Sequence, residues 1–277
     1  MLNSIVSYFS TYPAIRFASL AILLVSVCAA LLGVCLVLKR YSMIGDGLSH
    51  VSFGTTALAT ALGLMTPIYI AMPLTVIAAI LMLINSSGAK AKGDTAIAMI
   101  STGCLAFGYL ILNLFAPDAS SDACATLFGT GILAIGADDV ILCLCLSSFL
   151  LVFFIIFYNK IFSITFDEDF ASATGTKVKV YNLLIAAITG ITVVIAMNMT
   201  GALLVSALIT FPALSAMRLF KTFKSVVLCA AAISIICSII GILTSIVAAT
   251  PIGPTIVCAL LAAFVICYLI GIIFKKG

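Results

Sequence analysis

The feature that most constrains the fold is the length of the stretches that contain no charged residue. Three of them have 22, 23 and 20 residues and lie between Arg16 and Lys39, between Asp94 and Asp118, and between Asp139 and Lys160. A helix needs about 20 mostly apolar residues to cross a lipid bilayer. Because only 8% of the chain is charged and 64% is apolar, we expect an all-α, polytopic membrane protein.

Longer uncharged runs must contain a turn, because each exceeds the length of one span. Proline and glycine mark these turns at Thr66-Pro67, at Asn198 to Gly201 and at Thr250 to Pro254. The pattern predicts nine candidate segments, at residues 14–38, 45–64, 68–84, 94–116, 139–159, 181–198, 201–217, 226–248 and 255–274.

One of the nine segments could be a broken or re-entrant element rather than a full span. The segment 201–217 is the weakest candidate, since it is short and carries Pro212. Almost every residue is used by the segments, so no soluble domain fits. We therefore expect residues 1–277 to form a single transmembrane domain.

The charged residues predict how the segments are oriented in a plasma membrane. Basic residues fall at alternate ends of successive segments, at positions 39–40, 90–92, 160, 177–179, 218–224 and 275–276. The positive-inside rule places these ends in the cytoplasm. The opposite ends carry acidic residues at 118, 122, 138 and 139. The net charge of +4 therefore reflects topology, and no nucleic-acid partner is expected.

Ten cysteines are present, but their positions do not indicate a disulfide framework. Nine lie within apolar segments, where they are expected to act as small hydrophobic residues. Only Cys124 falls in a polar loop, and no CxxC spacing occurs.

Asp46 and His50 are the candidate functional residues within the predicted membrane segments. His50 is the only histidine in the chain, and the spacing of four residues puts both side chains on one face of a helix. Ionisable groups within a membrane usually mark a path for an ion or substrate. A carboxylate and an imidazole are also ligands for divalent transition metals. The pair predicts a cation site.

Each residue of this pair also has a purely structural interpretation. Asp46 could cap the start of a helix, and His50 could hydrogen-bond to a neighbouring helix. Two ligands are too few for tight zinc binding, which usually takes four. A second copy of the chain could supply the other two, and incomplete coordination would suit an ion that must also leave.

Two further stretches stand out between the apolar segments. Residues 166–179 hold three of the nine acidic residues, and Asp167 to Thr174 could form a short helix that ends at Gly175. This stretch is interpreted either as a solvated loop or as a docking helix for a cytoplasmic partner. Small residues and Pro212 in 200–213 favour close helix packing or a flexible gate.

Some motifs are missing from the sequence. It contains no Gly-Lys dipeptide, so a phosphate-binding P-loop is excluded, and ATP would have to be hydrolysed by another chain. Neither HExxH nor GxSxG occurs, which leaves little support for a membrane-embedded protease or lipase.

Several motifs together resemble the permease subunit of ABC-type zinc, manganese and iron importers. The resemblance covers almost the whole chain, and its strength comes from the order and spacing of the motifs. They are Leu38 to His50, Leu127-Phe128-Gly129, Asp167-Glu168-Asp169-Phe170-Ala171 with Gly175, Gly201 to Leu208 with Phe211-Pro212-Ala213, and Gly253 to Val257. One departure is Gly47, where the family often has a larger residue.

The resemblance implies a homodimer of permeases with about eight spans each, so one of the nine segments would be a half-helix. Two cytoplasmic ABC ATPase subunits would bind it, and an extracytoplasmic solute-binding protein would deliver the metal. The family's metal ligands match Asp46 and His50. Its cytoplasmic coupling helix matches Asp167, Glu168, Asp169, Phe170, Ala171 and Gly175, within a coupling loop at 161–179.

The resemblance predicts an ATP-driven importer of Zn²⁺ or Mn²⁺, or of Fe²⁺, with no permanently bound cofactor and no enzymatic activity of its own. The main alternative is a secondary, proton-coupled cation carrier, in which an Asp/His pair would serve the proton as well as the ion. A membrane-embedded metalloenzyme is a more distant alternative, because one Asp and one His make a poor catalytic metal site.

Overall fold

All regular elements in the described part of the chain are helices. The computed structural model describes residues 13–41, 43–64, 67–86, 90–120, 127, 129 and 135–274. Three short helices, α6 (Pro117–Ser120), α9 (Tyr158–Phe166) and α10 (Glu168–Ala173), lie outside the long ones. The prediction of an all-α fold is confirmed.

Nine long helices within these described ranges correspond one to one with the nine predicted segments. They are α2 (Pro13–Leu38), α3 (Met43–Ala61), α4 (Ile68–Ser86), α5 (Lys90–Phe115), α8 (Ala137–Ile156), α11 (Val178–Thr200), α12 (Ala202–Leu219), α13 (Phe223–Ala248) and α14 (Ile252–Phe274). The predicted turns near Pro67, Gly201 and Pro251 all fall between these helices.

Seven of the described helices are long and apolar enough to cross a membrane, which confirms a multi-pass membrane protein. The segment expected to be weakest forms α12, a continuous helix through Pro212, and it is one of the seven. Of the two remaining long helices, α3 carries the Asp/His pair and is more polar, and α4 is apolar over Ile68–Leu83, the part whose side chains are described.

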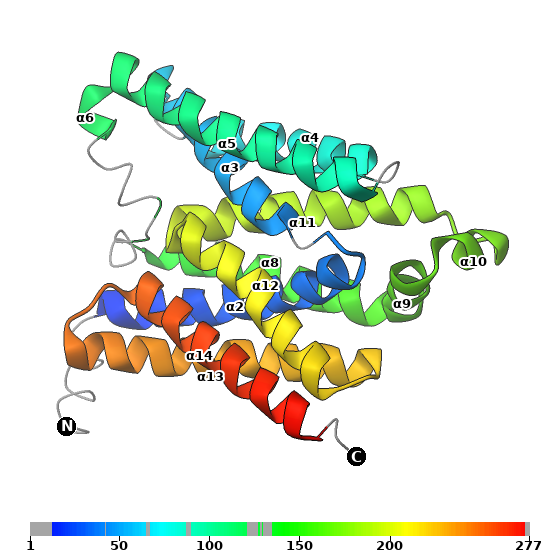
Figure 1. Ribbon diagram of the computed structural model, residues 1–277. Coiled ribbons are helices and arrows are strands. Elements are labelled where there is room, and N and C mark those ends of the chain that lie inside the picture. The colour runs from blue at the N-terminus through cyan, green and yellow to red at the C-terminus, as the bar shows by residue number, and fades with distance from the viewer. Residues whose placement is uncertain are drawn as a thin grey trace.

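The helices form a bundle in which α2 is the most buried element. Helix α2 packs against α12, α13 and α8, while α14 packs on α12 and α13. A second group is formed by α3, α4 and α5, and α11 and α12 contact α3 to join the two groups. Figure 1 shows α4 and α5 at one side of the bundle and α13 and α14 at the other.

Most basic helix ends gather at one end of the bundle, together with the acidic helix α10. The end of the bundle that holds α10 also holds the end of α2, the start of α5, α9, the start of α11 and the α12–α13 connection (Figure 1). Helix α6, with Asp118, and the start of α8, with Asp138 and Asp139, lie at the other. Residues 122 and 275–276, which belong to the predicted charge pattern, are outside the described residues.

Helices α3 and α5 approach so closely that their backbones touch. A Cβ atom on Gly54 would lie 2.6 Å from the carbonyl oxygen of Cys104, and one on Gly108 would lie 2.7 Å from the Cα atom of Gly54. Small residues allow this kind of contact between membrane helices. The contact holds α5 firmly against the helix that carries the Asp/His pair.

The nine cysteines that the structure describes are all free. Five of them, Cys28, Cys35, Cys143, Cys237 and Cys267, are buried and pack with apolar neighbours. Cys124 lies outside the described residues.

Candidate functional site

Asp46 and His50 lie in the first two turns of α3. The helix begins at Met43, so Asp46 is inside the first turn rather than at the cap position. A carboxylate in the first turn interacts favourably with the helix dipole. Within the described residues, the Asp46 side chain makes no capping hydrogen bond, and so the capping interpretation finds no support.

The two side chains point the same way without bonding to each other. Asp46 Oδ2 lies 3.6 Å from His50 Nε2, which is too long for a hydrogen bond. Two ligands that each bind one cation at about 2.1 Å can be at most about 4.2 Å apart. The observed separation therefore allows both atoms to bind the same ion.

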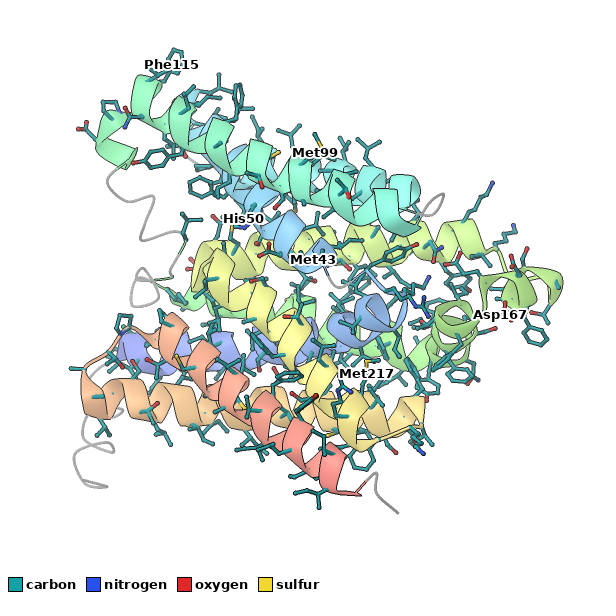
Figure 2. The ribbon with its side chains drawn as sticks, viewed as in Figure 1. Met43, His50, Met99, Phe115, Asp167 and Met217 are labelled. Carbon is teal, nitrogen blue, oxygen red and sulfur yellow. The ribbon has the colours of Figure 1, made fainter. Side chains whose placement is uncertain are left out.

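The pair opens into a cavity between α3 and α5. The cavity has a volume of about 130 Å³, enough for several water molecules or a hydrated ion. Its walls are made by Met43, Asp46, Gly47 and His50 from α3 and by Ile97, Ala98, Ser101, Thr102 and Leu105 from α5. Figure 2 shows Met43 and His50 on the part of α3 that lies next to α5.

His50 has one ring nitrogen that is not used by the fold. Nδ1 is buried and has no hydrogen-bond partner among the described residues, although buried polar atoms are usually paired. The alternative in which His50 bonds to a neighbouring helix is therefore not observed in this part of the chain. Within the described residues no cluster of three His, Cys, Asp or Glu side chains occurs, so one copy offers two strong ligands.

The predicted short helix in 166–179 is present as α10. Asp167 precedes it, and its side chain accepts a hydrogen bond of 2.9 Å from the backbone N–H of Phe170. Gly175 ends the turn with a φ of +81°, a left-handed conformation that glycine adopts without strain. Phe170 is 63% exposed and Asp169 is also exposed, whereas Ala171 is buried against the bundle.

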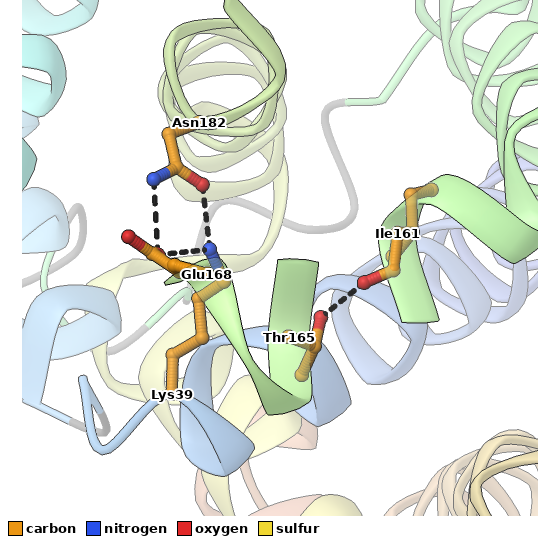
Figure 3. A network of polar contacts seen from close by, with 5 residues as sticks. All are labelled: Lys39, Ile161, Thr165, Glu168 and Asn182. Atoms are coloured by element: carbon orange, nitrogen blue, oxygen red, sulfur yellow. Dashed lines mark hydrogen bonds and ion pairs between the residues drawn. The ribbon is translucent and has the colours of Figure 1, made fainter. Parts of the chain in front are cut away.

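Three polar side chains connect α10 to two long helices (Figure 3). Lys39 Nζ, just after α2, lies 2.9 Å from Glu168 Oε1 and donates a hydrogen bond of 2.5 Å to Asn182 Oδ1 on α11. Asn182 Nδ2 donates to the same Glu168 oxygen at 3.0 Å. Each of the three residues therefore contacts the other two.

The electrostatics of this network favour a charged Glu168. Burial alone would raise the pKa of the Glu168 carboxyl, but hydrogen bonds from Lys39 and Asn182 and the positive charge of Lys39 lower the pKa below its usual value. The Lys39 side chain is only 5% exposed, while that of Glu168 is 44% exposed. The buried ammonium group thus depends on its two partners.

The turn after Lys39 leads directly to the Asp/His pair. Tyr41 N–H bonds to the carbonyl of Leu36 and Arg40 N–H to that of Val37, which is the Schellman pattern of a helix end. Arg40 takes the left-handed conformation, with a φ of 65°. Helix α3 begins only three residues later, so the network lies seven residues before Asp46.

The sequence identified Glu168 but missed Lys39 and Asn182 as its partners. The charge pattern predicts only that Lys39 lies at the cytoplasmic end of a helix, and it predicts no role for Asn182. The three residues are separated by up to 143 positions, and no local spacing links them. A polar Asn182 near the start of an apolar helix was the only available signal.

Comparison with known proteins identifies the family. A model of the ABC 3 transport family matches residues 11–271, nearly the entire chain. The chain is 30% identical to the high-affinity zinc uptake system membrane protein ZnuB of Haemophilus influenzae over 238 residues, which cover 85% of this chain and 89% of that protein. It is 26% identical to the manganese import system permease protein ScaB of Streptococcus gordonii, over 87% of this chain and 86% of that protein.

The fold has a counterpart among solved structures. The structure of PsaBC from Streptococcus pneumoniae in complex with Fab contains a chain that superposes with a TM-score of 0.84 at 25% identity. The match covers 97% of this chain and 95% of that one. Family, relatives and fold agree over the full bundle: the chain belongs to the ABC 3 transport family and is a multi-pass membrane permease rather than an enzyme.

Proposed function

We propose that the chain is the membrane-spanning subunit of an ATP-driven importer of divalent transition metal ions. The observation that carries the proposal is the Asp46/His50 pair, whose ligand atoms lie 3.6 Å apart and face a cavity. The relatives support metal as the cargo, since one is named for zinc uptake and another for manganese import. Zn²⁺, Mn²⁺ and Fe²⁺ all accept such mixed oxygen and nitrogen ligands.

The shortfall of ligands supports a homodimer. One copy offers one carboxylate and one imidazole, whereas a second copy related by a two-fold axis would bring the set to four. In this arrangement the ion is held between two α3 helices. A small rotation of one copy against the other would separate the two halves of the site and release the ion.

Helix α10 is the proposed contact for a cytoplasmic ATPase. The charge distribution supports a cytoplasmic location for this end of the bundle, with the N-terminus outside and the C-terminus inside. Phe170, Asp169 and Glu168 form an exposed face that mixes an aromatic ring with acidic groups. Movement of α10 would reach α3 through Glu168, Lys39 and the turn at Arg40. An extracytoplasmic solute-binding protein would deliver the ion at the opposite end.

The cation site is tested by metal uptake through the complete complex. We expect Asp46→Ala and His50→Ala each to abolish uptake of the metal without loss of assembly. Asp138→Ala is the matched control, because Asp138 is also an acidic residue in the first turn of a membrane helix but lies at the start of α8. Uptake at the wild-type rate in both site variants would overturn the assignment.

The coupling contact is tested by co-purification of the ATPase. Phe170→Ala should reduce the amount of ATPase that stays bound, while Phe149→Ala should not, because Phe149 is similarly exposed (58%) but lies on α8. Metal uptake that continues without any ATPase would instead favour the alternative of a secondary, proton-coupled carrier.

A further inference from the structure

The wall of the cavity opposite Asp46 and His50 contains two hydroxyl groups that the fold does not use. Ser101 and Thr102 lie on the face of α5 that lines the cavity. Ser101 is only 5% exposed, so its side chain is buried within the molecule. One turn before and one turn after this position, α5 presents the apolar residues Ile97 and Leu105. The two hydroxyls therefore form a single polar band in an otherwise apolar wall.

These hydroxyls differ from most hydroxyls in the described membrane helices, although Ser52 Oγ and Ser238 Oγ also have no partner there. Most of those donate to a carbonyl three or four residues earlier, as Ser49 does to Asp46 at 2.7 Å, Thr75 to Ala71 at 2.8 Å and Thr189 to Ile185 at 2.7 Å. In the described part of the chain, neither Ser101 nor Thr102 has a side-chain hydrogen bond. The fully buried unpaired side-chain atoms of the described residues are His50 Nδ1, Ser52 Oγ and Ser238 Oγ. The hydroxyls of Ser101 and of the exposed Thr102 instead line the cavity, where a bound species would complete their hydrogen bonds.

The position of this wall is fixed by the close contact between α3 and α5. Ser101 lies three residues before Cys104, whose carbonyl oxygen faces Gly54 at a distance that leaves no room for a Cβ atom. Rigid backbone contact of this kind holds a ligand group in place. This contact fixes the backbone of α5, and with it the positions from which both hydroxyl side chains extend, beside the cavity.

We propose that Ser101, assisted by Thr102, supplies a further oxygen ligand to the cation bound by Asp46 and His50, and that this oxygen makes the site favour Mn²⁺ over Zn²⁺. The inference rests on the proposed function of the pair. Two copies of Asp46 and His50 give four ligands, the number that Zn²⁺ prefers. One hydroxyl from each copy raises the number to six, which suits the octahedral, oxygen-rich coordination of Mn²⁺.

The experiment measures binding of each metal alone to the purified permease in complex with its ATPase. Mn²⁺ and Zn²⁺ are titrated separately into wild type, Ser101→Ala, Thr102→Val and the double variant. We expect Ser101→Ala to weaken Mn²⁺ binding by about ten-fold and to affect Zn²⁺ binding much less. Thr102→Val, which keeps the shape of the side chain, should act in the same direction with a smaller effect.

Two control variants separate this inference from the proposed function. Ser215→Ala removes an equally buried hydroxyl on α12, one that donates to the carbonyl of Phe211, and it should leave both affinities unchanged. Asp46→Ala should abolish binding of both ions. If Asp46→Ala abolishes binding of both ions but the double variant keeps the wild-type ratio of Mn²⁺ to Zn²⁺ affinity, the proposal that the hydroxyls bind the cation is wrong. Wild-type binding of both ions by Asp46→Ala would instead overturn the site itself.

Discussion

The ammonium group of Lys39 lies 2.9 Å from the carboxylate of Glu168, although 129 residues separate them. This ion pair joins the end of α2 to α10 and lies immediately before the turn that leads into α3. Asn182 bonds to both groups and adds the start of α11. The exposed helix α10 and the helix that carries the candidate cation site are thus connected by one small polar network.

The two partners of this ion pair should differ in their effect on stability. Glu168→Ala leaves a buried ammonium group with Asn182 alone, and we expect it to lower the free energy of unfolding by about 1–3 kcal/mol. Lys39→Met leaves a half-exposed carboxylate that water can solvate, with an expected cost below about 1 kcal/mol. Thermal unfolding of the purified variants measures both. Equal costs, or a larger cost for Lys39→Met, would contradict the burial that distinguishes the two side chains.

The same pair predicts how stability depends on pH. The pKa of Glu168 is lower in the folded protein than its ordinary value of 4.5. Its contribution to stability is therefore fully present above that value and is lost as the pH falls through the lowered pKa of the folded state. Unfolding curves at successive acidic pH values should show this loss in wild type. Lys39→Met should show a smaller loss over the same range, since the pKa shift depends on the ammonium group.

Asp167 should control the order of α10. Its carboxylate accepts the hydrogen bond of the Phe170 N–H, and removal of such a cap costs about 1 kcal/mol. We expect Asp167→Ala to speed hydrogen exchange at the amide of Phe170, while Asp167→Ser, which keeps a capping oxygen, should preserve most of the protection. Mass spectrometry of the peptide containing α10 measures the exchange. Equal exchange in the two variants would show that the cap does not order this helix.

The backbone contact between α3 and α5 should tolerate no side chain at Gly54. The added methyl group of Gly54→Ala would push against the carbonyl of Cys104, and overpacking of this kind costs about 1–3 kcal/mol. Separation of the helices should also widen the cavity and weaken metal binding. Gly103→Ala is the matched control, because no heavy atom of the described neighbours lies within 4 Å of the position that its methyl group would take. A Gly54→Ala variant with wild-type stability and metal affinity would contradict the close packing.

The sequence alone predicted the number and order of the long helices. Uncharged runs of about 20 residues, interrupted at Pro67, Gly201 and Pro251, reveal spans because lipid excludes charge and because proline interrupts helices. The α10 helix could also be predicted from the sequence, since Asp167 and Gly175 are local signals for the start and the end of a helix. These features depend on residues close together in the chain.

Predictions of which segment deviates from a full span were less successful. Pro212 suggested a weak element, but α12 remains continuous, because neighbouring helices stabilise a membrane helix around a proline. Instead α3, which contains Asp46 and His50, is too polar to qualify as a span by its own sequence. Packing inside the bundle allows α3 to keep Asp46 and His50 at the edge of a cavity.

The sequence likewise predicted one part of the candidate cation site, and the tertiary structure revealed the rest. Asp46 and His50 share a helical face, so their spacing of four residues was enough to predict that they act together. Only the tertiary structure brought α5 against α3, placed Ser101 and Thr102 in the same cavity, and joined Lys39 to Glu168 and Asn182. These contacts connect distant positions, and they depend on helix crossings that are set by close packing, as at Gly54 and Gly108, rather than by any local pattern in the sequence.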